Sequence, residues 1–199
     1  MSRFAVRSLT TTLALTLPTL AFAHTGVGST SGFAHGFGHP ISGIDHTFAM
    51  VLVGLLAYQL GGRALWLVPS AFVTLMAVGG ALGISGYGMP MVEAGIATSI
   101  IVLGAAVALK IKAPTAAAAG IAGLFALFHG HAHGSEMPAD AAGMAYAAGF
   151  VVATSLLHVA GLGLGYAIDR VGGSRGIAIS RAVGGLAVVA GFGLLAGML

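Results

Sequence analysis

The chain has 199 residues, of which 57% are hydrophobic and 7% charged, with 33 glycines and no cysteine. Soluble domains carry about 25% charged residues, so this composition excludes an ordinary cytosolic globule, a disordered chain and a nucleic-acid-binding protein. The eight Lys and Arg are scattered along an apolar chain and form no basic patch. Without cysteine there is no disulfide and no thiolate metal site, and eight histidines make imidazole the over-represented chemical group.

Residues 1–23 have the features of a secretory signal peptide. Arg3 and Arg7 precede an apolar stretch over residues 9–20, and the Ala-Phe-Ala sequence at 21–23 has the small-x-small pattern of a cleavage site. We expect a mature chain that begins at His24, outside the cytoplasm, with an uncleaved first helix as the alternative. A free amino terminus beside an imidazole would make His24 a further candidate metal ligand.

Six apolar segments follow a Gly- and Ser-rich stretch at 24–38. A bilayer core requires about 20 apolar residues per helix. We therefore predict one all-α domain over residues 24–199, a bundle of six transmembrane helices. Its spans lie at about 40–60, 64–84, 90–109, 115–133, 141–168 and 177–198. Pro40, Pro90 and Pro114 stand at the start of three spans, where a missing N–H costs nothing.

The basic residues orient these spans. All six Lys and Arg of the predicted mature chain lie in segments that join spans one to two, three to four and five to six: Arg63, Lys110, Lys112, Arg170, Arg175 and Arg181. The positive-inside rule makes those segments cytoplasmic and places both mature termini in the periplasm. We therefore expect a multi-pass protein in the lipid bilayer of the bacterial inner membrane, with most carboxylates and histidines at its outer end.

The first candidate site is the run His-Pro-Ile-Ser-Gly-Ile-Asp-His at residues 39–46. If Pro40 is the first helical residue, Asp45 and His46 lie about 8–9 Å along the span. Ionisable side chains at such a depth normally face a bundle interior or an aqueous path. Adjacent helix positions diverge by about 100°, so one of the two would bind a metal while the other orients a partner imidazole. A hydrogen-bonded cluster that locks spans together is the alternative.

The second candidate site is the run His-Gly-His-Ala-His-Gly-Ser-Glu at residues 129–136. On a continuous helix His129, His133 and Glu136 share one face, whereas His131 points elsewhere. Nitrogen and oxygen ligands together suit a divalent first-row metal rather than Ca²⁺ or Mg²⁺. The alternative is a flexible external loop, because the two glycines could end the helix.

Two further ionisable residues complete the candidate set. Glu93 lies in the first turn of span three, where the helix dipole also favours a carboxylate. His158 lies deep in span five, as a relay or second ligand or as a packing residue bonded to Thr154 or Ser155. The candidate metal-binding residues are His39, Asp45, His46, Glu93, His129, His133 and His158, with His24, His131 and Glu136 as further candidates.

The run at 39–46 resembles the signature of the HupE/UreJ family, small bacterial inner-membrane proteins associated with nickel uptake for hydrogenase or urease. The run at 128–136 resembles the fourth-helix motif of that family, and the likeness covers nearly the whole chain. Five residues separate His39 from Asp45. This spacing departs from the shorter element of the larger nickel/cobalt permeases and argues against membership of that second family. The resemblance implies Ni²⁺ as the metal, handled by His39, Asp45, His46, His129 and His133.

We therefore expect a secondary transporter or facilitator, not an enzyme, that imports Ni²⁺ (or Co²⁺) and supplies a nickel enzyme such as hydrogenase or urease. The sequence contains no phosphate-binding loop for a nucleotide, and a homo-oligomeric state is left open. A permease for Cu²⁺ or another divalent metal is an alternative, because affinity rises toward Cu²⁺ and thioethers are present near the outer side. Those thioethers belong to Met50, Met89, Met91 and Met137. Two different classes of protein also stay open: a non-transporting metal sensor or buffer, and a rhomboid-like intramembrane serine protease that uses Ser85 and His158.

Overall fold

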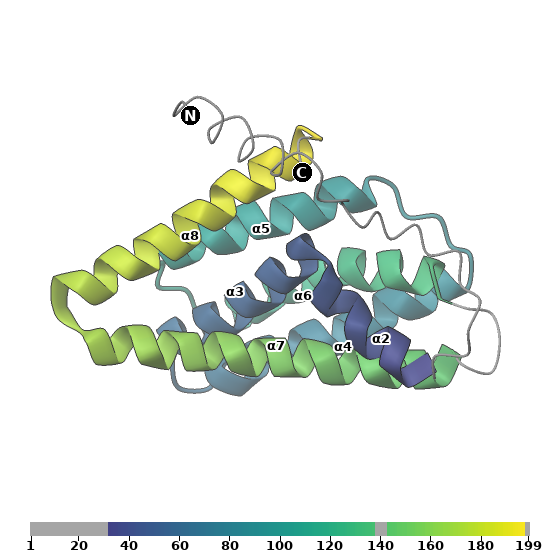
Figure 1. Cartoon of the computed structure of the whole chain (residues 1–199), viewed down its shortest axis with the longest axis horizontal. Helices are drawn as coiled ribbons and strands as arrows, with labels where there is room; N and C mark the ends of the chain where they lie inside the picture. Colours follow the sequence, from purple (N-terminus) through teal and green to yellow (C-terminus); the bar gives the residue numbers. More distant parts are fainter. Residues whose placement is uncertain (1–31, 138–142, 198–199) are drawn as a thin grey trace, which may run out of the picture.

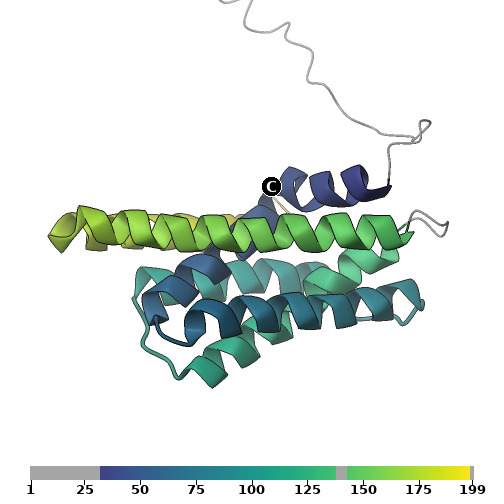
Figure 2. The same cartoon turned by 90° about the horizontal axis from the view of Figure 1, so that it is seen from below.

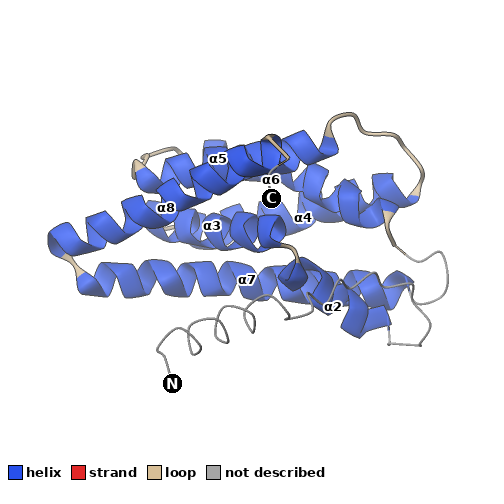
Figure 3. Cartoon of the chain, turned by 45° about the horizontal axis from the view of Figure 1, so that its top comes forward, coloured by secondary structure: helices blue, strands red, loops and turns tan. Residues whose placement is uncertain are grey.

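The described part of the chain, residues 32–137 and 143–197 of a computed structural model, contains seven α-helices and no strand (Figure 3). In chain order the helices are α2 (Gly32–Ser42), α3 (Ile44–Leu60), α4 (Ala64–Ile84), α5 (Val92–Ala108), α6 (Thr115–Ser135), α7 (Gly143–Val171) and α8 (Gly173–Leu195). The all-α prediction is confirmed. The expected signal peptide and His24 lie outside the described residues.

Four helices, α4, α6, α7 and α8, are long and apolar enough to cross a membrane. Helices α2 and α3 pass the same test together as one broken span, bent by 81°. Helix α5 is apolar but has only 17 residues and does not reach the required length. The described helices therefore support a multi-pass membrane protein with four or five candidate spans, compared with the six predicted.

The start of the first predicted span was wrong. Residues 32–38, which precede the predicted first span, belong to α2, and Pro40 lies inside that helix rather than at the start of a span. The chain breaks at Gly43, where the backbone is extended, so Asp45 and His46 stand in the first turn of α3. The physical reason is that Gly43 leaves the helical conformation, so the run of helical hydrogen bonds stops and α2 ends at Ser42.

The other helix boundaries follow the prediction more closely. Pro90 precedes α5 by two residues, and Pro114 is the residue directly before α6. Helix α8 begins at Gly173 rather than at 177, because Gly172 and Gly173 reverse the chain at positive φ of 67° and 54°. Glycine adopts this left-handed backbone conformation without the penalty that a Cβ imposes.

Helix α3 lies at the centre of the bundle. Its residues from 49 to 57 are nearly all buried, and it contacts every other described helix. Around it, α5 pairs with α8, α4 pairs with α6, and the long helix α7 runs along the opposite side from α8 and α5 (Figure 1). Figure 2 shows α7 extending along nearly the whole molecule. A helix that is apolar on all sides is expected at such a central position.

Close backbone contact between α4 and α6 fixes the end of α6. A Cβ at Gly79 or Gly83 on α4 would collide with the backbone of α6, and a Cβ at Gly130 or Gly134 would collide with the backbone of α4. Small residues of this kind allow helices in a membrane to approach closely, where the hydrophobic drive between helices is absent. The last turns of α6, which carry the second histidine motif, are therefore held firmly against α4.

Candidate metal centre

The sharp bend between α2 and α3 brings the first histidine motif toward α6. The Thr47 hydroxyl donates to the carbonyl of Pro40 at 3.0 Å, which ties the first turn of α3 back to α2. A Cβ at Gly43 would lie 2.9 Å from Asp45 Oδ1 and 3.2 Å from His46 Nδ1. A side chain at this position would therefore have to displace the Asp45–His46 pair.

Imidazoles from three helices gather beside the last turns of α6. The ring centroid of His133 lies 4.1 Å from that of His46 on α3 and 4.6 Å from that of His39 on α2. The ring of His46 lies 4.9 Å from that of His129. We call His39, His46, His129 and His133 the histidine cluster. The two motifs, some 90 residues apart in the chain, therefore converge at one place.

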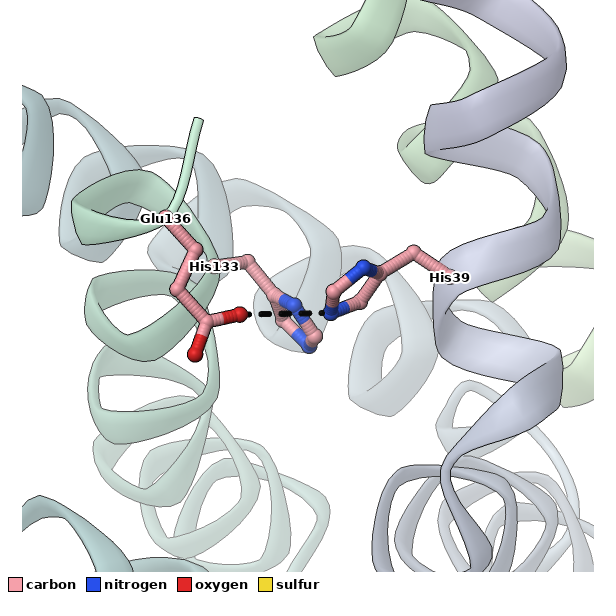
Figure 4. A group of neighbouring side chains, drawn as sticks. All are labelled: His39, His133 and Glu136. Carbon is pink, nitrogen blue, oxygen red and sulfur yellow. Dashed lines mark ion pairs between the residues drawn. The ribbon is translucent and has the colours of Figure 1, made fainter. Parts of the chain in front are cut away.

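Glu136 extends the histidine cluster toward solvent. Its Oε2 lies 3.4 Å from Nε2 of His39 (Figure 4). One ligand atom from each of His39, His133 and Glu136 lies within 4.8 Å of the others, close enough for small side-chain movements to bring all three onto one ion. The exposed fraction is 63% for the Glu136 side chain and 29% for that of His39, whereas His133 is 5% exposed. The site is thus open at Glu136 and closed at His133.

The carboxylate of Asp45 sets the tautomer of His46. Nδ1 of His46 lies 2.8 Å from Oδ1 of Asp45. An ionised carboxylate only accepts hydrogen bonds, so Nδ1 carries the proton and donates, and in the neutral ring Nε2 keeps its lone pair. Nε2 is buried and has no hydrogen-bond partner among the described residues. This arrangement, in which a carboxylate orients a histidine, is the one that metal-ligating histidines commonly use.

Ser99 on α5 orients His129 in the same manner. The Ser99 hydroxyl donates its single proton to the carbonyl of Ile96 at 2.6 Å. Its oxygen must therefore accept from Nε2 of His129, 2.9 Å away. Nδ1 of His129 is left with the lone pair, and within the described part of the chain it has no partner.

His133 lies between the other imidazoles with both ring nitrogens buried and unpaired among the residues described. A buried polar group without a partner costs about 1–3 kcal/mol. Phe150 on α7 covers the ring at 4.2 Å between centroids and donates no hydrogen bond. A metal ion that His133 shares with His39 or His46 would satisfy one of these nitrogens.

Two predicted residues lie apart from the histidine cluster. His131 turns away from it, and its Nε2 donates to the carbonyl of Tyr87 at 2.6 Å. Helix α6 continues through both glycines to Ser135, so the predicted division of faces on this helix is confirmed. Glu93 is exposed in the first turn of α5 and lines a cavity of about 400 Å³ together with Asp45. Glu93 thus lines the same cavity as Asp45, the carboxylate that orients His46.

His158 is buried deep in α7 at 2% exposure. Its ring packs edge-on against Phe72 of α4 at 5.1 Å, and Phe72 also lies 5.7 Å from the ring of His129. The hydroxyls of Thr154 and Ser155 donate to other groups. The alternative in which one of them binds His158 is therefore not supported, because both ring nitrogens lack a partner among the described residues.

The geometry separates Ser85 from His158. Ser85 is exposed at the end of α4, and its hydroxyl donates to the carbonyl of Leu82 at 2.7 Å. His158 packs against Phe72 of α4. Phe72 precedes Ser85 by thirteen residues, which separates the two by about 20 Å along the axis of α4. A serine nucleophile requires a base within hydrogen-bond reach, so the protease alternative is not supported.

Sequence reasoning missed four residues at the site. Ser99 was detectable in principle, as a polar side chain within an apolar helix. Tyr146, with its ring 6.0 Å from that of His39, and Phe150 were not detectable, because a core aromatic has the same sequence pattern. His35, one turn before His39, has its ring 6.1 Å from that of His39 and was not selected.

Comparison with known proteins adds an independent observation. A protein-family model described as HupE / UreJ protein matches residues 12–194. The chain is also 50% identical over 190 residues to Protein HupE of Rhizobium leguminosarum bv. viciae, which covers 95% of this chain and 97% of that relative. No solved structure matches the chain.

Proposed function

The chain belongs to the HupE/UreJ family, and on this basis we propose that it is a secondary transporter or facilitator that imports Ni²⁺ from the periplasm to the cytoplasm. Co²⁺ would be the second substrate, and the imported nickel would supply an enzyme such as hydrogenase or urease. The observation that carries the proposal is the convergence of imidazoles from α2, α3 and α6 on His133.

The proposed topology has six spans, with residues 1–23 removed as a signal peptide and both mature termini in the periplasm. Helix α5 would be the short span. Its 17 residues extend about 26 Å, slightly less than a hydrocarbon core of about 30 Å, and local thinning of the bilayer accommodates such a mismatch. Support comes from the basic residues, since Arg63, Lys110 and Arg170 stand at or between helix ends on the same side of this topology.

The exposure of the candidate ligands suggests the order in which they act. Glu136 and His39 are partly exposed and carry the first charge and lone pair that an arriving cation would meet. His133 and His46 are buried behind them and would replace water in the coordination sphere. Because a histidine must be neutral to bind a metal, the proposed site favours binding near neutral pH and release on protonation. His129 and the deeper His158, both in contact with Phe72, would continue the path inward.

The membrane potential is sufficient to drive this import. A charge moving inward gains about 2.3 kcal/mol per 100 mV, and Ni²⁺ carries two charges. The bundle therefore requires no nucleotide, in keeping with the absence of a phosphate-binding loop from the sequence.

The proposal is tested by nickel flux into proteoliposomes that contain the full-length chain. We expect His133→Ala to abolish the flux, because it removes the imidazole shared by His39 and His46. His131→Ala is the matched control: it lies on the same helix two residues away but is paired with Tyr87, so it should retain the flux. Equal flux through His133→Ala and wild type would contradict the proposal. Binding of Ni²⁺ without flux would instead favour a non-transporting sensor or buffer.

One observation keeps a copper permease as the second candidate. Met76 and Met137 line a cavity of about 160 Å³ together with His133. Thioether sulfur selects Cu(I), and affinity among divalent ions peaks at Cu²⁺. Competition between Ni²⁺, Co²⁺, Cu²⁺ and Zn²⁺ for flux decides between the two, and replacement of Met137 by leucine should affect copper alone.

A further inference from the structure

A second group of polar side chains surrounds a cavity of about 600 Å³ at the other end of α3. We call it the inner cavity, because it lies on the cytoplasmic side of the proposed topology. Its polar lining consists of Tyr58, Gln59, Lys110, Asp169 and Ser180. His46 and Gln59 are thirteen residues apart in one unbroken helix, so about 20 Å of α3 separates the inner cavity from the histidine cluster.

The inner cavity offers oxygen atoms as ligands. The Tyr58 hydroxyl donates to Oδ2 of Asp169 at 3.4 Å, which leaves Oδ1 of the carboxylate available. The Gln59 amide nitrogen donates to the carbonyl of Val107 at 3.4 Å and lies 3.5 Å from Oγ of Ser180. This orientation leaves Oε1 of Gln59 buried and without a partner among the described residues. Side-chain carbonyl oxygens are among the ligands of hard divalent cations, and a rotation of the Gln59 side chain, which lines the cavity, would present this oxygen to an ion there.

Lys110 limits the charge of this lining. It follows α5 in the left-handed backbone conformation at φ 50°, is exposed, and lines the same cavity as Asp169. The two formal charges cancel, so a divalent cation would be held by oxygen dipoles and one partly compensated carboxylate. A site on a conduction path must bind weakly enough for the ion to leave, and this charge balance meets that requirement.

We propose that the inner cavity is a low-affinity release site for a divalent cation, with Asp169 and Gln59 Oε1 as its ligands. This inference rests on the proposed transport function. Borderline first-row ions prefer imidazole nitrogen to neutral or carboxylate oxygen. Binding in the inner cavity would therefore be weaker than at the histidine cluster. The membrane potential would drive the transfer, and weak binding would let the ion leave for the cytoplasm.

The binding part of the inference is tested with Mn²⁺, which prefers oxygen ligands, on purified full-length protein. The single tryptophan, Trp66, follows cavity residue Leu65 directly and serves as a local fluorescent reporter. We expect Mn²⁺ to quench the Trp66 fluorescence saturably. Asp169→Asn should weaken the Mn²⁺ affinity about ten-fold, because one charge is lost. Lys110→Gln should strengthen Mn²⁺ binding, and Ser85→Ala, an exposed position outside both sites, should leave it unchanged.

Quenching that never saturates, or that Asp169→Asn leaves unchanged, would overturn the inference. If Asp169→Asn does not give folded protein, Tyr58→Phe removes only the hydroxyl that positions the carboxylate and should weaken Mn²⁺ binding several-fold, and an unchanged affinity would again overturn it. In proteoliposomes, Asp169→Asn should lower the maximal rate of Ni²⁺ flux and leave KM unchanged. If wild type carries no Ni²⁺, the proposed function fails, whereas the Mn²⁺ titration still decides whether the site exists.

Discussion

Asp45 and His46 are adjacent in the sequence and are joined by a hydrogen bond of 2.8 Å between Oδ1 and Nδ1. The same Asp45 oxygen also accepts from the backbone N–H of His46 at 2.8 Å, so one carboxylate fixes both the ring and the first turn of α3. The opposite nitrogen of His46 is thereby left free on a ring that packs against His133. The lone pair on Nε2 of His46 is therefore already available to bind a metal ion.

We predict that Asp45→Asn weakens Ni²⁺ binding by about 10- to 100-fold, the usual loss when the partner of a metal-ligating histidine is changed. The asparagine amide can donate to Nδ1 and thus favour the tautomer with its proton on Nε2. Isothermal titration of the purified variant measures the effect. A folded variant that binds Ni²⁺ with wild-type affinity would show that Asp45 has no orienting role.

Ser99→Ala should lower Ni²⁺ affinity through His129. The substitution removes the oxygen that accepts from Nε2 of His129, so the ring loses its fixed orientation without any change in its own chemistry. Ser85→Ala is the matched control, because the Ser85 hydroxyl binds only a carbonyl of its own helix at an exposed position. Radioactive nickel binding to both variants gives the comparison, and equal losses would contradict the assignment.

Gly130→Ala should destabilise the bundle and reduce nickel flux together. A Cβ at this position collides with the backbone carbonyl of Met76, whereas a Cβ at Gly120 on the same helix meets nothing within 4 Å. Gly120→Ala should therefore leave stability unchanged or raise it slightly, since alanine favours helix by about 1 kcal/mol. Thermal unfolding in detergent, followed by size-exclusion chromatography, measures the stability of the two variants. Ni²⁺ flux into proteoliposomes measures their transport. A Gly130→Ala protein as stable as wild type would refute close packing of α4 and α6.

Ni²⁺ affinity should fall as the pH is lowered. A proton and a metal ion compete for the same lone pair on each ring nitrogen. Affinity is therefore expected to be greatest in neutral and alkaline solution and to decline as the solution is made acidic. Replacing His39 and His133 by alanine removes two competing sites and should flatten the profile. A wild-type affinity that does not change with pH would exclude imidazole as the principal ligand.

The sequence predicted the helical class and the two histidine motifs because both follow from local patterns. Apolar segments of sufficient length indicate spans, and a spacing of four residues places His129 and His133 on one face. The sequence did not predict the break at Gly43, since glycine also occurs inside helices here, for example at Gly54. Side-chain contacts across the break stabilise it, namely the Thr47 hydroxyl on the carbonyl of Pro40 and the Asp45–His46 pair beside Gly43.

Side-chain partners from distant segments were equally inaccessible from the sequence. Ser99 binds His129 across 30 residues of chain, and Phe72 meets His158 across 86. Which polar residue of an apolar helix faces which neighbour depends on helix rotation, and the helix-packing glycines determine that rotation. A local pattern shows that a residue is unusual but does not identify what it contacts.

The central claim is that His133 of α6 shares one ion with a histidine of α2 or α3. It is tested most directly by crystals of the full-length protein soaked in Ni²⁺, with diffraction data collected at the nickel absorption edge. The account predicts one anomalous peak within coordination distance of His133 and of at least one of His39 and His46. A peak bound by residues of a single helix, or located away from His133, would contradict it.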